Sequence, residues 1–167
     1  MKRIVVFLVF FISITMLSAA GKQDKEFTSK KLGISLSAPK DWEVEEDKNE
    51  PLVSLYSPET KQHPAKTLDL EKGLKMELTS MDEKHFQEIM RGVKAEEFVV
   101  LANANGKEHI TIYSEKGTYG GASIICLHAL ITKGDKGIWV IGYLPEKNKM
   151  DEYAEKYLLV ISTITFI

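Results

Sequence analysis

The chain has 167 residues, of which 44% are hydrophobic and 28% are charged. These proportions are typical of one ordinary globular domain and exclude a disordered or collagen-like chain. The 22 basic and 24 acidic residues nearly balance, with a formal net charge of −2, and the lysines are spread along the chain without a basic stripe. The composition therefore argues against binding to nucleic acid or to an anionic membrane surface.

The first twenty residues follow the pattern of a secretory signal peptide. Lys2 and Arg3 precede an uncharged, apolar stretch at 4–17, and small side chains follow at 18–20, so we expect cleavage after Ala20. The apolar stretch is shorter than the roughly 20 residues of a membrane-spanning helix. An uncleaved N-terminal anchor is the alternative. The pattern predicts an exported bacterial protein, either periplasmic or secreted.

After cleavage, the sequence predicts a flexible leader at 21–26 and a single domain at 27–167, with no further membrane span. Loss of Lys2 and Arg3 leaves 20 basic and 24 acidic residues, so the net charge becomes −4. The single cysteine, Cys126, excludes an intrachain disulfide. A domain of this size buries enough surface to be stable without disulfides.

Apolar and polar residues alternate in the first half of the domain, which predicts short strands. In the stretch at 73–79, apolar residues alternate with Lys75, Glu77 and Thr79, so we expect these three side chains to face water. The polar stretch at 57–66 is expected to be a surface loop. The predicted strands of this half lie at 27–30, 33–38, 42–46, 52–56 and 73–79.

A helix is predicted after these strands. Ser80 and Glu83 have the spacing of a capping box, in which the serine hydroxyl binds the N3 amide. Apolar side chains then recur every three or four residues and form one stripe, and Gly92 marks the expected end. The residues of the stripe are Phe86, Ile89, Met90 and Val93.

The Asn105-Gly106 pair predicts a β-hairpin, because both turn positions of a tight hairpin need positive φ angles. It joins strands predicted at 97–102 and 108–114. The expected cross-strand pairs are Leu101 with Ile110 and Val99 with Ile112.

The stretch at 122–132 is the most hydrophobic of the domain, which predicts a central strand covered on both faces. A turn at 134–137 leads into a further strand at 138–144. The chain then closes with a helix at 149–162, for which Asn148 is the expected N-cap. Strands that carry two helices indicate an α+β fold: a mainly antiparallel sheet with helices packed on it, arranged as a three-layer α/β/α sandwich.

Two motifs lie near the ends of the domain. Gly33-Ile34-Ser35-Leu36 leads into Pro39-Lys40-Asp41-Trp42, and Trp139-Val140-Ile141-Gly142-Tyr143 is followed by an amphipathic helix and residues 162–166. This arrangement resembles the PsbP-like α/β/α sandwich family, which includes the extrinsic PsbP protein of photosystem II and many exported bacterial proteins. The resemblance implies the same fold and an accessory role, and it carries no catalytic residue over to this chain.

The sequence lacks the motifs of common enzyme sites, including G-x-S-x-G, H-E-x-x-H, a glycine-rich phosphate loop and C-x-x-C. We therefore expect a protein that is not an enzyme and that needs no cofactor. A hydrolase site assembled in space from distant residues is the enzymatic alternative.

One candidate metal site follows from the predicted strand pairing. A turn near Gly117-Thr118 sets His109 opposite Cys126, whereas a turn one residue later sets it opposite His128. In both registers, His109, Cys126 and His128 share one face and lie within reach of one another. Two imidazoles and a thiolate are ligands for zinc or copper. The alternative is structural: two partly buried histidines beside a cysteine that packs as a small hydrophobic residue.

Other polar residues are expected to be solvated, namely His63 in the surface loop, His85 on the exposed side of the first helix and the acidic run at 43–47. The bend at 119–121 is expected to be a bulge.

The sequence thus supports two functions. One is an exported accessory domain that binds another envelope protein, and the other is a small-ligand or metal-binding protein that uses the sheet face around the candidate site.

Overall fold

The computed structural model describes residues 24–60, 69–70, 72–93, 96–102, 109–119, 121–147 and 149–167. The predicted signal peptide, the Asn105-Gly106 turn and His63 lie outside these residues. The helical elements are η1 (Pro58–Thr60), α2 (Glu83–Val93) and α3 (Met150–Thr163). The strands are β1 (Lys25–Ser29), β2 (Ile34–Ala38), β3 (Glu43–Glu46), β4 (Leu52–Tyr56), β5 (Lys75–Ser80), β6 (Glu96–Ala102), β7 (His109–Tyr119), β8 (Ala122–Lys133), β9 (Lys136–Pro145) and β10 (Thr165–Phe166).

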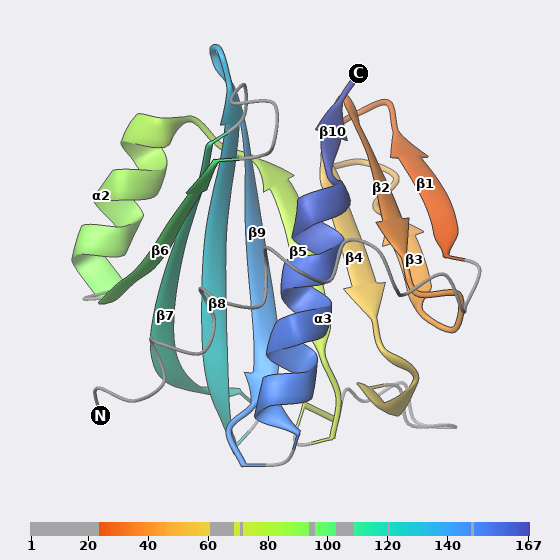
Figure 1. The fold of residues 1–167 in the computed structure, drawn as a ribbon, viewed down its shortest axis with the longest axis vertical. Coiled ribbons are helices and arrows are strands. Elements are labelled where there is room, and N and C mark those ends of the chain that lie inside the picture. The colour runs from red at the N-terminus through yellow and green to blue at the C-terminus, as the bar shows by residue number, and fades with distance from the viewer. Residues whose placement is uncertain are drawn as a thin grey trace.

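The strands form two antiparallel sheets (Figure 1). The larger, seven-stranded sheet has the order β3-β4-β5-β9-β8-β7-β6. The smaller sheet has the order β1-β2-β10, so the last strand of the chain pairs with the second. Lys25 and Glu26 belong to β1, and their assignment to a flexible leader was therefore wrong.

The two faces of the large sheet are covered by different helices. Ala129 and Val140 pack on one face with Tyr157 of α3 and with the small sheet. Leu130, on the opposite face, packs with Phe86 of α2. Figure 1 shows α3 crossing in front of β9 and β5, with α2 near the edge formed by β6 and β7. The layers are thus α2, the large sheet, and α3 together with the small sheet, which confirms the predicted α+β sandwich.

Asp82, and not Ser80, caps α2. The helix begins at Glu83, and Asp82 Oδ1 accepts a hydrogen bond of 2.9 Å from the backbone N–H of His85. Ser80 is the last residue of β5 and lies opposite Ile138 of β9. The predicted capping box was wrong because sheet pairing keeps Ser80 extended, so that the next good capping residue starts the helix.

The predicted register of the β6–β7 hairpin is confirmed. Leu101 lies opposite Ile110, and Val99 lies opposite Ile112. These pairs follow from the turn signal at Asn105-Gly106, because the position of a short turn determines which residues of its two strands meet.

The predicted turn between β7 and β8 is wrong. β7 runs through Gly117 without interruption and ends at Tyr119, which pairs with Ala122. Gly121 follows with a φ of 88°, a conformation that glycine adopts without steric cost. The hairpin turn therefore lies between Tyr119 and Ala122, where a bulge was expected.

The start of α3 also differs from the expectation. The N-cap is Lys149, with a φ of 56° and no side-chain capping hydrogen bond, and not Asn148. Asp151 and Glu152 occupy the first turn, where negative charge interacts favourably with the helix dipole.

The motif at 39–42 forms a turn that places an aromatic residue in the core. The backbone N–H of Trp42 donates to the carbonyl of Pro39 at 2.9 Å. The Trp42 side chain is buried with residues of both sheets and of α3.

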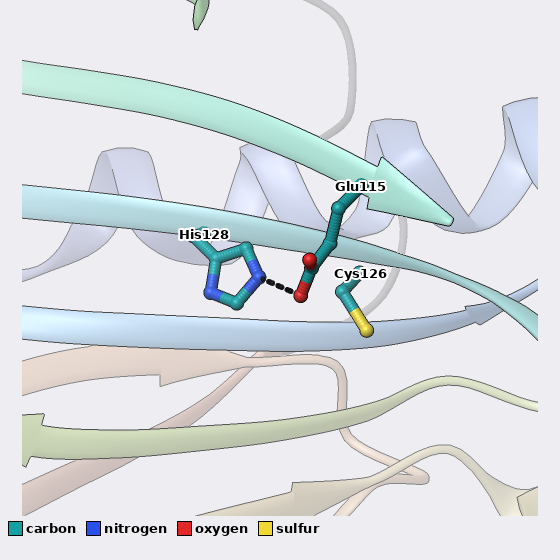
Figure 2. A group of neighbouring side chains, drawn as sticks. All are labelled: Glu115, Cys126 and His128. Atoms are coloured by element: carbon teal, nitrogen blue, oxygen red, sulfur yellow. Dashed lines mark hydrogen bonds and ion pairs between the residues drawn. The ribbon is translucent and has the colours of Figure 1, made fainter. Parts of the chain in front are cut away.

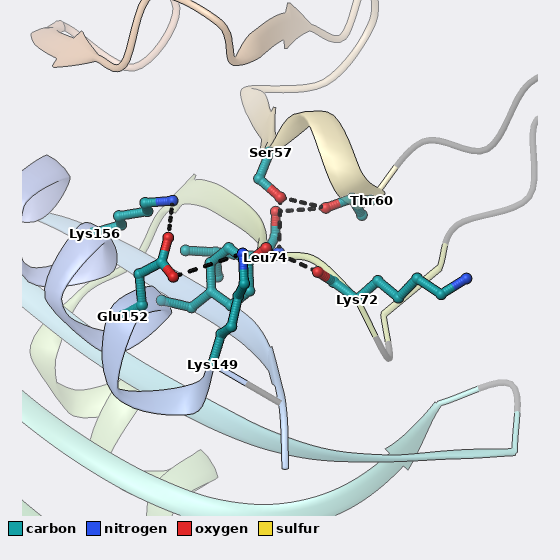
Figure 3. Close-up of polar contacts among 8 residues, drawn as sticks. Ser57, Thr60, Lys72, Leu74, Lys149, Glu152 and Lys156 are labelled. Carbon is teal, nitrogen blue, oxygen red and sulfur yellow. Dashed lines mark hydrogen bonds and ion pairs between the residues drawn. The ribbon is translucent and has the colours of Figure 1, made fainter. Parts of the chain in front are cut away.

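Hydrogen bonds of two buried hydroxyls anchor the start of β5 (Figure 3). Ser57 Oγ accepts from the backbone N–H of Leu74 at 3.0 Å, and Thr60 Oγ1 donates to the Leu74 carbonyl at 2.9 Å. The stretch predicted as a surface loop at 57–66 thus begins with a turn whose ends, Ser57 and Thr60, are buried and whose middle residues, Pro58 and Glu59, are exposed. Its residues 61–66 lie outside the described part. The anchor holds the backbone immediately before Lys75, the first residue of β5.

Candidate functional site

Two adjacent rows of side chains cross the face of the large sheet on which α2 packs. Residues directly opposite each other in antiparallel strands present their side chains to the same face. One row consists of Glu115, Cys126, Tyr143, Lys75 and Tyr56, and the other of Tyr113, His128, Ile141, Glu77 and Ser54. We call these two rows the polar band.

Glu115 and His128 are linked across β7 and β8 (Figure 2). His128 Nε2 lies 3.0 Å from Glu115 Oε1, and because a carboxylate only accepts, Nε2–H is the donor. His128 is only 5% exposed, and its ring stacks on Trp139 with 5.8 Å between the ring centroids. Burial lowers the pKa of His128, although the hydrogen bond and the charge of Glu115 act in the opposite direction.

The other ring nitrogen of His128 has no hydrogen-bond partner among the described residues. Nδ1 is fully buried, and with the proton on Nε2 it holds a free lone pair. A buried polar atom without a partner is uncommon in folded proteins and carries a desolvation cost.

Cys126 lies directly opposite Glu115 on one side and Tyr143 on the other. It packs in a small cluster with Leu70 and Ile124. Burial raises the pKa of the Cys126 thiol to about 11, and the charge of Glu115 adds to this shift. The thiol is therefore protonated near neutral pH and is a weak nucleophile as it stands.

The other half of the polar band is organised around Lys75. Its Nζ lies 2.6 Å from Glu77 Oε1 and stands over the rings of Tyr143 and Tyr56, 5.6 and 5.9 Å from their centroids. Tyr143 donates its hydroxyl hydrogen to Glu77 Oε2 at 3.0 Å. The expectation that Lys75 faces water was wrong, since only 8% of the residue is exposed.

The structure brings together two of the three predicted metal ligands. Cys126 and His128 lie together, and Glu115 joins them: one ligand atom of each lies within 4.8 Å of the other two. His109 lies opposite Thr132, four residues along β8 from His128. Four residues of extended strand span about 13 Å, so the prediction that His109 lies within reach of the other two was wrong.

The sequence reasoning missed Glu115 because it placed the turn too early. In an antiparallel hairpin, each residue by which the turn moves shifts the cross-strand partner by two. With the turn between Tyr119 and Ala122, Cys126 meets Glu115 and His109 moves away. The glycine pair at 120–121 was the signal that could have located the turn.

Charged residues also line a cleft of about 610 Å³ at the ends of several strands. His85 lies there beside Asp82, with its side chain 67% exposed, as predicted for this residue. Asp135 of the β8–β9 turn and Lys136, the first residue of β9, also line the cleft. The acidic run at 43–47 is likewise exposed except for Val44, in agreement with the prediction.

Within the described residues, no helix has the length and apolar character needed to cross a membrane.

No protein-family model matches the chain, and no curated protein sequence matches it. Solved structures, in contrast, match the chain. A crystal structure of a protein from Bacteroides thetaiotaomicron VPI-5482 superposes with a TM-score of 0.61 at 16% identity over 87% of this chain, which spans about half (49%) of that protein. The solution structure of cyanobacterial PsbP (CyanoP) from Synechocystis sp. PCC 6803 superposes with a TM-score of 0.54 at 11% identity, over 90% of this chain and 96% of that one. The fold predicted from the sequence motifs is therefore confirmed: the chain has a PsbP-like α/β/α sandwich fold.

Proposed function

We propose that this protein is an exported, non-enzymatic accessory domain that binds another protein of the cell envelope through the polar band. The secretory pattern of residues 1–20 supports export. The absence of common catalytic motifs from the sequence supports a binding role.

The observation that carries the proposal is an exposed aromatic residue, Tyr119, which adjoins the polar band at the end of β7. Tyr119 is 45% exposed and lies beside Tyr143, with 5.9 Å between the ring centroids. Tyr143 in turn flanks Lys75, which also lies over Tyr56. Tyrosines that combine a large apolar ring with a polar end are enriched in protein interfaces, where charged residues beside them add specificity.

The test is site-specific photo-crosslinking in living cells of the natural host. A photo-crosslinking phenylalanine analogue is placed either at Tyr119 or at Leu159, which is 50% exposed on α3 and therefore belongs to the opposite layer. We expect a discrete crosslinked product from position 119 and none from position 159. Equal products from both positions, or none from position 119, would contradict the proposal.

A second variant ties the crosslink to the polar band. Tyr56→Ser removes an aromatic side chain at the far end of the band from the crosslinker. We expect it to lower the yield about tenfold, the effect of losing an interface residue that contributes about 1.4 kcal/mol. Leu159→Ser is the matched control and is expected to leave the yield unchanged. If both variants give the wild-type yield, the crosslink at position 119 does not report binding by the polar band.

Export is tested separately by the intact mass of the protein recovered from the host. We expect the mass of a chain that begins at Gly21, because Ala20 ends the predicted signal peptide. Recovery of the uncleaved chain in the membrane fraction would instead support the N-terminal anchor.

A further inference from the structure

We propose that Glu115, Cys126 and His128 form a binding site for a divalent transition-metal ion, and specifically for Zn²⁺. This inference is independent of the proposed protein partner, because it rests on the three side chains alone.

The first argument is convergence. Glu115 projects from β7, whereas Cys126 and His128 are two residues apart on β8 and so present their side chains to the same face (Figure 2). One ligand atom of each lies within 4.8 Å of the others. Tetrahedral Zn²⁺, with bonds of about 2.0–2.3 Å, separates its ligand atoms by roughly 3.5 Å, so side-chain movements of about 1 Å close the site.

The second argument is the chemistry of the donors. A thiolate, an imidazole and a carboxylate together suit Zn²⁺, which accepts sulfur, nitrogen and oxygen ligands, and suit Ca²⁺ and Mg²⁺ poorly, since these prefer oxygen alone. Three protein ligands also leave one position of a tetrahedral ion for water or another small ligand. The site therefore has the ligand number of an open zinc site.

The third argument is preorganisation. Trp139 stacks on the His128 ring and fixes its plane, while Tyr143 packs against the cluster that contains Cys126. Cys126 and His128 are 7% and 5% exposed, so little side-chain freedom remains to be lost on binding. Glu115 is the more mobile ligand, since its side chain is 26% exposed.

Binding rearranges protons in a defined way. The ion replaces the thiol proton of Cys126, which leaves to solvent. It also replaces the hydrogen bond between His128 Nε2 and Glu115, so that Nε2 ligates through its lone pair and the ring proton moves to Nδ1. Nδ1 has the free lone pair that receives this proton.

The test uses the full chain, expressed without a histidine tag and freed of metal with a chelator. Co²⁺ is titrated first, because a cobalt–thiolate bond gives a charge-transfer absorption in the near ultraviolet and a tetrahedral site gives strong visible bands. We expect both signals to saturate at one equivalent of Co²⁺ and to disappear when Zn²⁺ displaces it.

Single substitutions identify the ligands. Cys126→Ser is expected to abolish the charge-transfer band. Glu115→Gln and His128→Ala each remove a ligand, and each is expected to weaken Zn²⁺ binding by at least about 10–100-fold, the loss that follows when only a hydrogen-bond partner of a ligand is removed. His85→Ala, which removes an exposed histidine outside the site, is the control and is expected to bind as the wild type does.

Far-ultraviolet circular dichroism confirms that each variant is folded, and Cys126→Ala replaces Cys126→Ser if the serine variant is not. The proposal is overturned if the wild-type protein gives no charge-transfer band with stoichiometric Co²⁺. It is also overturned if Glu115→Gln and His128→Ala both bind Zn²⁺ with wild-type affinity.

Discussion

Gly142 of β9 lies directly against the ring of Tyr157 of α3. A Cβ atom at position 142 would lie 2.6 Å from Tyr157 Cδ2, closer than any normal carbon contact. The ring has no room to move, because Tyr157 is fully buried and its hydroxyl donates to the carbonyl of Val140 at 3.0 Å. The lack of a side chain at Gly142 therefore decides how closely α3 approaches the sheet.

Gly142→Ala is expected to destabilise the protein by about 1–3 kcal/mol, the usual cost of overpacking a core. Urea unfolding measures the change. Gly92→Ala is the matched control: Gly92 is exposed in α2 with nothing within 4 Å of a Cβ, so the substitution is expected to stabilise the helix by up to about 1 kcal/mol. An unchanged unfolding free energy for Gly142→Ala would show that α3 can shift away from the sheet.

The buried His128 predicts a pH dependence of stability. Its pKa lies below the usual value of 6.5 in the folded protein, mainly because of burial. Between that lowered pKa and 6.5, the unfolded chain binds a proton that the folded protein does not, so stability falls as the pH falls through this window.

Urea unfolding between pH 7.5 and the acid limit of stability measures this dependence. His128→Gln is expected to reduce the loss of stability below pH 6.5. His85 is exposed and has a raised pKa from its contact with Asp82, so its contribution has the opposite sign and lies above pH 6.5. His85→Gln is therefore expected to remove a small gain of stability as the pH falls toward 6.5 and to leave the slope below pH 6.5 unchanged. A slope unaffected by His128→Gln would mean that His128 protonates equally well in the folded state.

Cys126 is predicted to react slowly with alkylating reagents in the folded protein. Its pKa of about 11, against a reference value of 9.0, lowers the thiolate fraction near neutral pH by about 100-fold, and burial restricts access further. Mass spectrometry after treatment with iodoacetamide measures the rate, and the protein in concentrated urea is the control. Because the chain has one cysteine, the mass shift reports this residue alone. Equal rates in both conditions would contradict the buried position.

Glu77 is predicted to matter more for stability than a surface carboxylate with a similar ion pair. Glu77→Gln leaves the charge of Lys75, whose side chain is only 10% exposed, without its carboxylate partner, and we expect a loss of about 1–3 kcal/mol.

Glu152→Gln is the matched control for Glu77→Gln. Glu152 pairs with Lys156 at 2.7 Å in α3, but its side chain is 46% exposed, so the pair is expected to contribute at most about 0.5 kcal/mol (Figure 3). Urea unfolding compares the two variants. Equal losses of unfolding free energy would show that water or other polar groups solvate the Lys75 ammonium group when the Glu77 carboxylate is absent.

Local patterns in the sequence were sufficient to predict most of the elements. The alternation of apolar residues identified the strands, and the stripe that includes Phe86 identified α2 to within a residue at its end. Asn105-Gly106 predicted which residues of β6 and β7 meet, because a short turn and its flanking strands are one local unit. The motif that ends at Trp42 indicated the resemblance to the PsbP-like fold.

Only the tertiary structure decided what lies beside each strand. β5 pairs with β9, more than fifty residues later, and this pairing sets Lys75 beside Tyr143 and removes it from water. Likewise, the position of one turn decided whether His109 or Glu115 joins Cys126. A periodic pattern shows which face a side chain occupies, whereas its neighbours across the sheet depend on strand order and register, which arise from contacts between distant parts of the chain.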